Sequence, residues 1–321
     1  MPAEVKKRLP PWFKISLTTS EQYRSIKELI RTNKLHTVCQ SAACPNQNEC
    51  WNAGTATFMI LGNVCTRGCR FCNVPKGIPS GIDRDEPARV ARTVAELNLR
   101  YAVITSVTRD DLPDGGAEIF AATIKAIRNS SPDCRVEVLI PDFRGSAESL
   151  TTVLNASPDV LNHNLETTPS LYSRVRPQAL YHRSLELLSR ARQLGAITKT
   201  GLMLGLGEGR DEVMSVLHDL RGVDCQILTL GQYLQPGRNH LPVEKYYSPD
   251  EFTNFREEAL SLGFNHVVAG PLVRSSYHAS FLQMSQFRKQ HKETLSLIDP
   301  TQPYFYTLKW KKLELAAEKD I

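Results

Sequence analysis

Short apolar runs alternate with amphipathic stretches along most of this chain, and this alternation limits its possible folds more than any other feature. The first run is TFMIL (57–61) and the last is HVVAGPLV (266–273). The other strand-like runs are 101–107, 135–141, 159–166, 197–206 and 226–234. Stretches with helical spacing are 86–98, 116–129, 146–155, 181–194, 209–221 and 249–262. Repeated strand–helix units predict a parallel sheet with helices outside it.

The repeat has a period of roughly 30 to 40 residues, which favours a barrel over a doubly wound sheet. We therefore predict an α/β fold, a partial TIM-like (β/α)6 barrel over residues 57–273. Residues 1–56 are expected to form an N-terminal extension, and residues 274–321 a C-terminal extension with a charged tail. In such barrels the functional groups gather at the carboxyl ends of the strands.

Composition excludes several classes of protein. The 321 residues are 41% apolar and 23% charged, which is typical of a globular protein. A net charge of +5 without an interleaved basic and aromatic face gives no indication of nucleic-acid binding. No apolar run reaches the roughly 18 residues of a membrane span, and no apolar core follows the basic N-terminus as in a secretory signal. We expect a cytoplasmic protein, whose thiols stay reduced.

Cys65, Cys69 and Cys72 form a C-x3-C-x2-C motif directly after the first strand. A 4Fe–4S cluster normally takes four cysteines, so three thiolates leave one iron open to a substrate or cofactor. A zinc site would need a distant C-x2-C or H-x3-H partner, which this sequence lacks. Arg67 and Arg70 are expected to add positive charge near the thiolates.

Cys39, Cys44 and Cys50 form a second triplet, C-x4-C-x5-C, before the barrel. Its spacing leaves two interpretations open. One is a second cluster whose fourth ligand comes from elsewhere in the chain. The other is a zinc knuckle completed by His36.

The first motif, with an aromatic Phe71 before its last cysteine, resembles the radical S-adenosylmethionine superfamily. This resemblance implies that the open iron binds S-adenosylmethionine and that a 5′-deoxyadenosyl radical abstracts hydrogen from unactivated carbon. The two triplets together resemble the lipoyl synthase family. So do RSSYH (274–278), SVTRDDLPDGGA, LNHNLETTP and GLMLGLGE, and the likeness extends over about residues 10–285.

The family resemblance implies that a serine of the RSSY segment ligates the fourth iron of an auxiliary cluster. We assign Ser276 to this role, with Ser275 as the second choice. From the residues alone, capping of a helix is the favoured interpretation of both serines, because HASFLQMSQFRK follows with helical spacing.

The resemblance also implies two 4Fe–4S clusters and insertion of two sulfur atoms at C6 and C8 of an octanoyl-lysine. The auxiliary cluster would donate the sulfur. The implied partners are an octanoylated lipoyl carrier domain (of 2-oxoacid dehydrogenase complexes or glycine cleavage H protein), a reductant such as flavodoxin or ferredoxin, and an iron–sulfur cluster carrier. The alternatives are a biotin-synthase-like sulfur-inserting enzyme and a non-enzymatic iron–sulfur or zinc-binding module.

Polar residues at the predicted strand ends are candidates for contacts with S-adenosylmethionine. They are Thr105, Ser106, Asn162, Asn164, Glu166, Lys199 and Gln232. Each is equally consistent with a hydrogen-bonded residue inside the barrel. Asp110, Asp111 and Asp114 resemble acids at a helix start as much as ligands. His163 and His278 are possible site residues, although a lone histidine is more often structural.

Overall fold

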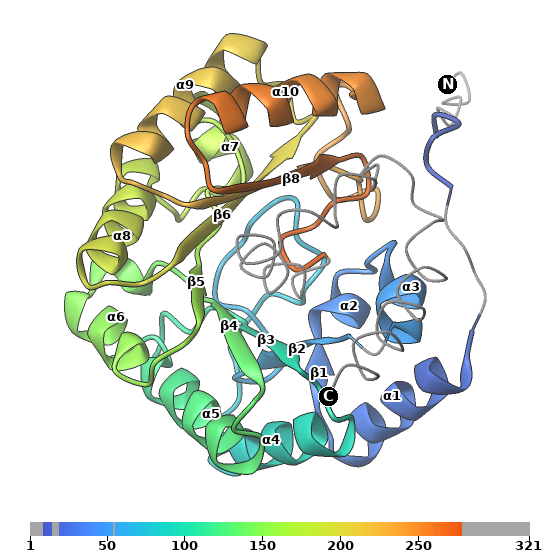
Figure 1. Cartoon of the computed structure of the whole chain (residues 1–321), viewed down its shortest axis with the longest axis vertical. Helices are drawn as coiled ribbons and strands as arrows, with labels where there is room; N and C mark the ends of the chain where they lie inside the picture. The colour runs from blue at the N-terminus through green and yellow to red at the C-terminus, as the bar shows by residue number, and fades with distance from the viewer. Residues whose placement is uncertain (1–8, 15–18, 54, 278–321) are drawn as a thin grey trace, which may run out of the picture. The chain divides into compact units, whose positions relative to one another are not determined.

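A curved sheet of eight strands forms the centre of the protein (Figure 1), and its strands lie side by side in chain order. The computed structural model describes residues 9–14, 19–53 and 55–277. The strands are β1 (His36–Thr37), β2 (Thr57–Ile60), β3 (Tyr101–Ser106), β4 (Arg135–Leu139), β5 (Val160–Asn162), β6 (Thr198–Leu204), β7 (Ile227–Gln232) and β8 (His266–Gly270). β1 pairs antiparallel with β2, and every later pair is parallel.

A helix lies between each pair of consecutive parallel strands and covers the outside of the sheet (Figure 1). These helices are α4 (Glu86–Glu96), α5 (Ala117–Ser130), α6 (Ala147–Leu154), α8 (Tyr181–Gln193), α9 (Arg210–Gly222) and α10 (Pro249–Ser261). Three short elements precede α6 or α8: η1 (Phe143–Gly145), η2 (Pro169–Leu171) and α7 (Tyr172–Val175). The predicted strand–helix alternation and the partial barrel are confirmed.

Local sequence explains where α10 begins and ends. The Ser248 hydroxyl accepts from the Glu251 backbone N–H at 3.2 Å, and the Glu251 carboxylate accepts from the Ser248 N–H at 2.8 Å. This reciprocal capping box occupies two backbone donors that the helix itself leaves unpaired. Pro249 suits the first turn, where no N–H is needed. Gly263, at φ +96°, ends the helix in the left-handed conformation.

The N-terminal extension contains three helices that the sequence analysis did not predict. They are α1 (Glu21–Thr32), α2 (Val38–Ser41) and α3 (Gln47–Asn52). Ile26, Ile30 and Trp51 are buried and belong to the same apolar cluster as Phe58 and Ile60 of β2. The extension therefore shares its core with the barrel, and the boundary between residues 56 and 57 stays a prediction.

The predicted charged tail and His278 lie outside the residues described here. Among the described residues, no helix is both long and apolar enough to span a membrane.

Candidate active site

The loop between β2 and α4 carries Cys65, Cys69 and Cys72 as free thiols at the carboxyl end of β2. Its two ends are held together, because the Cys65 N–H donates to the Pro75 carbonyl at 2.8 Å and the Gly77 N–H donates to the Cys65 carbonyl at 3.0 Å. These bonds fold the loop back on itself and keep the three cysteines on one compact turn.

The thiols of this first triplet interact with one another electrostatically. Burial raises the pKa of Cys69, and it raises the pKa of Cys72 to about 11. The negative charges that Cys65 and Cys69 would carry raise the pKa of Cys72 further. Bound iron supplies the positive charge that buried thiolates lack, so the chemistry of this donor set fits an iron–sulfur cluster.

The second triplet lies on and between the short helices α2 and α3, with Cys39 in α2, Cys50 in α3 and Cys44 between them. The Cys44 N–H donates to the Cys39 carbonyl at 3.0 Å, and the Cys50 N–H donates to the Asn46 carbonyl at 2.9 Å. Burial raises the pKa of Cys39 to about 11 and the pKa of Cys50 well above its usual value, with repulsion among the three thiolates adding to both shifts. This donor set has the same character as the first and fits a second cluster equally well.

Neither triplet forms a site for a single metal ion. Within the described part of the chain, no three His, Cys, Asp or Glu side chains are arranged to hold one ion. A cubane cluster distributes its thiolate ligands over separate iron atoms, so its ligands need not converge in this way. The zinc knuckle with His36 stays an alternative for the second triplet. Burial lowers the pKa of His36, and the charge of Arg89 lowers it further.

Two hydrogen bonds connect the segment that contains RSSY to residues that lie between the cysteines of the second triplet. The Asn46 side-chain amide donates to the Leu272 carbonyl at 2.6 Å, and the Tyr277 hydroxyl donates to the Glu49 carboxylate at 2.9 Å. Ser275 and Ser276 lie between these two tethers in the chain. The helix that either serine would cap lies in residues that the structure does not describe. The alternative that Ser275 or Ser276 caps a helix therefore stays open.

Arg274 adds a charge interaction to these tethers. Burial raises the pKa of Cys44, whereas the backbone N–H of Asn46 and then the positive charge of Arg274 lower it. The Arg274 guanidinium is also near Glu166, since the charge of each affects the pKa of the other. Arg274 therefore interacts with one cysteine of the second triplet and with a carboxylate at the barrel's carboxyl end.

Unpaired polar atoms gather where β3 and β5 end. The Ser106 hydroxyl and the Asn164 carbonyl oxygen are buried without a hydrogen-bond partner among the described residues. The Asn164 amide donates to Glu166 at 3.1 Å, and burial raises the pKa of Glu166. A Cβ on Gly201 would lie 3.0 Å from the Asn164 oxygen, so a side chain there would crowd this region. Buried polar atoms normally have partners, and these fit a polar ligand.

Comparison with known proteins identifies the family. Residues 2–44 match the model of the N-terminal domain of lipoyl synthase of the Radical_SAM family, and residues 59–220 match that of the Radical SAM superfamily. A lipoyl synthase of Roseiflexus sp. (strain RS-1) is 56% identical over 85% of this chain and 91% of its own length. One of Rubrobacter xylanophilus is 56% identical over 84% of this chain and 85% of its own length. The chain belongs to the lipoyl synthase family.

Two solved structures share the fold. HydG, a maturase of the FeFe-hydrogenase, matches with a TM-score of 0.51 at 16% identity, over 77% of this chain and 68% of its own. Streptococcus suis SuiB bound to S-adenosylmethionine matches with a TM-score of 0.52 at 10% identity, over 70% of this chain and 54% of its own. Membership of the lipoyl synthase family makes this protein a radical S-adenosylmethionine enzyme, with a 4Fe–4S cluster and S-adenosylmethionine as cofactors.

Two of the predicted S-adenosylmethionine contacts have a partner inside the barrel. The Lys199 ammonium forms a buried ion pair with both carboxylate oxygens of Glu137, at 2.9 and 3.0 Å. The Asn162 amide donates to the same carboxylate at 3.1 Å, and the Tyr101 hydroxyl donates to it at 2.7 Å. This pairing favours a role for Lys199 within the barrel interior, the alternative given for each predicted contact, whereas the Asn162 side-chain oxygen is buried without a partner among the described residues and stays a candidate contact.

Gln232 and Thr105 also have partners. The Gln232 amide group donates to the Lys245 carbonyl at 2.9 Å, and its oxygen accepts from the Tyr247 N–H at 2.9 Å. The Thr105 hydroxyl donates to the Leu139 carbonyl at 3.1 Å. Their contact with S-adenosylmethionine stays a prediction. Ser106, Asn164 and Glu166 are the predicted contacts that the geometry favours most.

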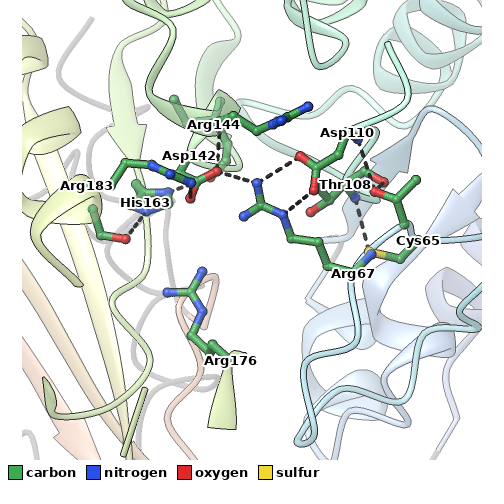
Figure 2. Close-up of polar contacts among 12 residues, drawn as sticks. Cys65, Arg67, Thr108, Asp110, Asp142, Arg144, His163, Arg176 and Arg183 are labelled. Carbon is green, nitrogen blue, oxygen red and sulfur yellow. Dashed lines mark hydrogen bonds and ion pairs between the residues drawn. The ribbon is translucent and has the colours of Figure 1, made fainter. Parts of the chain in front are cut away.

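The positive charge expected from Arg67 near the thiolates is paired with two carboxylates. Its guanidinium forms a bidentate pair with Asp110 at 2.6 and 2.8 Å and contacts Asp142 at 2.5 Å (Figure 2). Asp111 pairs with Arg109 at 2.8 Å. The Asp114 carboxylate accepts from two N–H groups at the start of α5, at 2.9 and 2.8 Å, as expected of a helix-start acid.

Sequence reasoning missed Arg176, which points into the space between Cys65 and His163 in Figure 2. It is buried, and it donates to the carbonyls of Asn164 and Leu165 at 2.9 and 3.0 Å. Its charge opposes the rise that burial causes in the pKa of Cys69 and of Glu166. An arginine outside any cysteine motif or strand end carried no signal for this position.

Proposed function

We propose that this protein inserts two sulfur atoms, at C6 and C8, into an octanoyl chain that is amide-linked to a lysine of a lipoyl carrier domain. Membership of the lipoyl synthase family supports the reaction. The tethering of the RSSY segment to the second cysteine triplet carries the proposal, because it offers that triplet a serine oxygen in addition to three thiolates.

The proposed roles differ between the two triplets. Cys65, Cys69 and Cys72 would hold the 4Fe–4S cluster that works with S-adenosylmethionine. Ser106, Asn164 and Glu166 would bind that cofactor through their unpaired or charged oxygens. When bound, the 4Fe–4S cluster and S-adenosylmethionine would supply the radical that abstracts hydrogen. The second cluster would supply the sulfur.

Cys39, Cys44, Cys50 and Ser276 would hold the second cluster. An alkoxide is a harder ligand for iron than a thiolate, so a site with one serine is easier to dismantle than one with four cysteines. Arg274 lies beside Cys44 and Glu166, and its charge would stabilise anionic groups on both sides. Two C–H bonds are replaced by two C–S bonds, and each replacement consumes one S-adenosylmethionine.

The partners and the compartment follow from this activity. We propose that the protein acts in the cytoplasm on an octanoylated carrier domain, with a flavodoxin- or ferredoxin-type reductant. An iron–sulfur cluster carrier would rebuild the second cluster between turnovers. We also propose a division of labour among an N-terminal extension (1–56), the barrel (57–273) and a C-terminal extension (274–321).

Anaerobic turnover with an octanoyl-lysine peptide tests the proposal. After cluster reconstitution, mass spectrometry should find a peptide that has gained two sulfur atoms, and that loses two hydrogens when its two new thiols are afterwards oxidised to a disulfide. The amount should approach one product per chain when no sulfur source is added. Release of 5′-deoxyadenosine without any sulfur in the peptide would contradict the proposed reaction while leaving the superfamily assignment intact.

A further inference from the structure

The segment Cys65–Arg67 is joined to the loop that follows β3 through Thr66. The Thr66 backbone N–H and hydroxyl both donate to the Thr108 carbonyl, each at 3.0 Å. The same hydroxyl accepts from the Asp110 N–H at 3.0 Å. One threonine side chain therefore bonds to the neighbouring loop on both sides of Arg109.

Arg67 reinforces the connection one residue later. Its guanidinium binds both oxygens of Asp110 and reaches Asp142 on the loop after β4 (Figure 2). The Arg67 side chain is only 4% exposed, and Asp142 is fully buried. Bidentate arginine–carboxylate pairs fix geometry as well as charge. The Arg67 side chain thus ties the cysteine loop to the next two strand-end loops.

These connections direct two N–H groups at one sulfur. The Thr108 N–H donates to the Cys65 sulfur at 3.4 Å, and the Arg67 N–H donates to the same sulfur at 3.4 Å. Hydrogen bonds to the sulfurs are one of the factors that set the reduction potential of an iron–sulfur cluster. An N–H dipole stabilises the more negative, reduced state, so each such bond raises the potential.

We propose that Thr66 and Arg67 are positioning residues that hold the Thr108 N–H against the Cys65 sulfur and thereby raise the reduction potential of the cluster on the first triplet. The inference rests on the proposed assignment of that cluster. It adds that Thr66 and Arg67, two of the three residues between Cys65 and Cys69, act through hydrogen bonds rather than through the charge of Arg67, which two carboxylates already balance.

The test is a redox titration of the reconstituted full-length protein, followed by electron paramagnetic resonance. The signal to follow is the one that changes when S-adenosylmethionine is added to a parallel sample. Thr66→Val keeps the side-chain shape and removes both hydroxyl bonds. We expect this variant to lower the equilibrium constant for reduction about tenfold, which is about 59 mV for one electron. Thr66→Ser keeps the hydroxyl and should retain the wild-type potential.

Two further variants make the test specific. Thr151→Val removes a hydroxyl bond of 2.8 Å to a carbonyl within α6, away from the cysteines, and should leave the potential unchanged. Arg67→Lys cannot form the bidentate pair with Asp110 and should lower the potential in the same direction as Thr66→Val.

The possible outcomes distinguish failure of the inference about the reduction potential from failure of the proposed function. An assembled cluster with an unchanged potential in both Thr66→Val and Arg67→Lys overturns the inference, as does an equal shift in Thr151→Val. If neither variant assembles the cluster while Thr66→Ser does, the contacts serve assembly rather than potential, and the inference is again wrong. A wild-type protein without a cluster on the first triplet would instead overturn the proposed function.

Discussion

Adjacent serines in the RSSY segment allow a sharp comparison at the scale of single residues. If Ser276 supplies the fourth ligand, Ser276→Ala should lower the yield of sulfur-inserted product at least about tenfold. Cleavage of S-adenosylmethionine should stay intact. Ser275→Ala should form product at close to the wild-type rate. Product mass and 5′-deoxyadenosine measured in the same reaction distinguish the two. The reverse pattern would move the ligand to Ser275.

Asp142 makes a second prediction at this scale. Burial alone would raise its pKa, but the hydrogen bond and charge of Arg67 outweigh burial and lower the pKa to about 2. A lowered folded-state pKa gives stability that is present above about pH 4 and is lost as the pH falls toward 2. Asp142→Asn should therefore cost about 2 kcal/mol of unfolding free energy at pH 7.

Urea denaturation of the wild type and Asp142→Asn at pH 7 and at pH 3 measures this contribution. The difference between the two proteins should shrink at the lower pH. Asp219→Asn, which removes the charge of an exposed carboxylate that accepts from the Tyr181 hydroxyl, serves as the control. A difference that grew on acidification would mean that Asp142 is not ionised beside Arg67.

Among the secondary-structure elements, β5 is connected to its neighbours through His163, which is fully buried. One ring nitrogen lies 2.9 Å from the Ile140 carbonyl, which accepts only, and the other lies 2.9 Å from the Ser184 hydroxyl of α8. The ring therefore donates to Ile140 and accepts from Ser184. Burial lowers the pKa of His163 to about 4, so this histidine is neutral and structural.

Ser184→Ala should leave a buried ring nitrogen without a donor and cost about 1 to 3 kcal/mol of unfolding free energy. Ser189→Ala, on the same helix but partly exposed, should change stability by less than about 0.5 kcal/mol. Urea midpoints at pH 7 compare the two. Equal midpoints would show that the His163–Ser184 contact contributes little to holding α8 against the sheet.

For the whole molecule, the two triplets predict separable losses of iron. The wild-type protein should hold about eight irons per chain after anaerobic reconstitution, as two cubane clusters require. Cys65→Ala should lose about half of the iron and all cleavage of S-adenosylmethionine. Cys39→Ala should lose the other half and retain cleavage, but form no lipoyl product. Cys134→Ala, at a buried cysteine outside both triplets, should retain iron and activity.

Much of the architecture could be predicted from the sequence, because the spacing of apolar residues within each segment indicates a strand or a helix. The strand starts (within one residue), the caps at Ser248 and Gly263, and the placement of both cysteine motifs follow from neighbouring residues. The strands end earlier than predicted, β5 at Asn162 rather than at Glu166.

Pairings across the fold do not follow from neighbouring residues. Lys199 and Glu137 are 62 residues apart, and only the pairing of β4 and β6 with β5 brings the charges together. The carboxylate partners of Arg67 likewise come from the loops after β3 and β4, 43 and 75 residues along the chain, so its pairing could not be predicted.

The hydrogen bond between Asn46 and Leu272 joins residues 226 positions apart. It therefore affects when the surroundings of the second triplet are completed during synthesis of the chain. During synthesis at about 5 to 20 residues per second, the second triplet emerges roughly 10 to 45 seconds before the segment that completes its surroundings. The loop of the first triplet bonds to Thr108, Val175 and Leu241, all of which are made before Leu272. A newly made chain therefore exposes the second set of thiols for longer, and that set needs protection from oxidation until the last strand has docked.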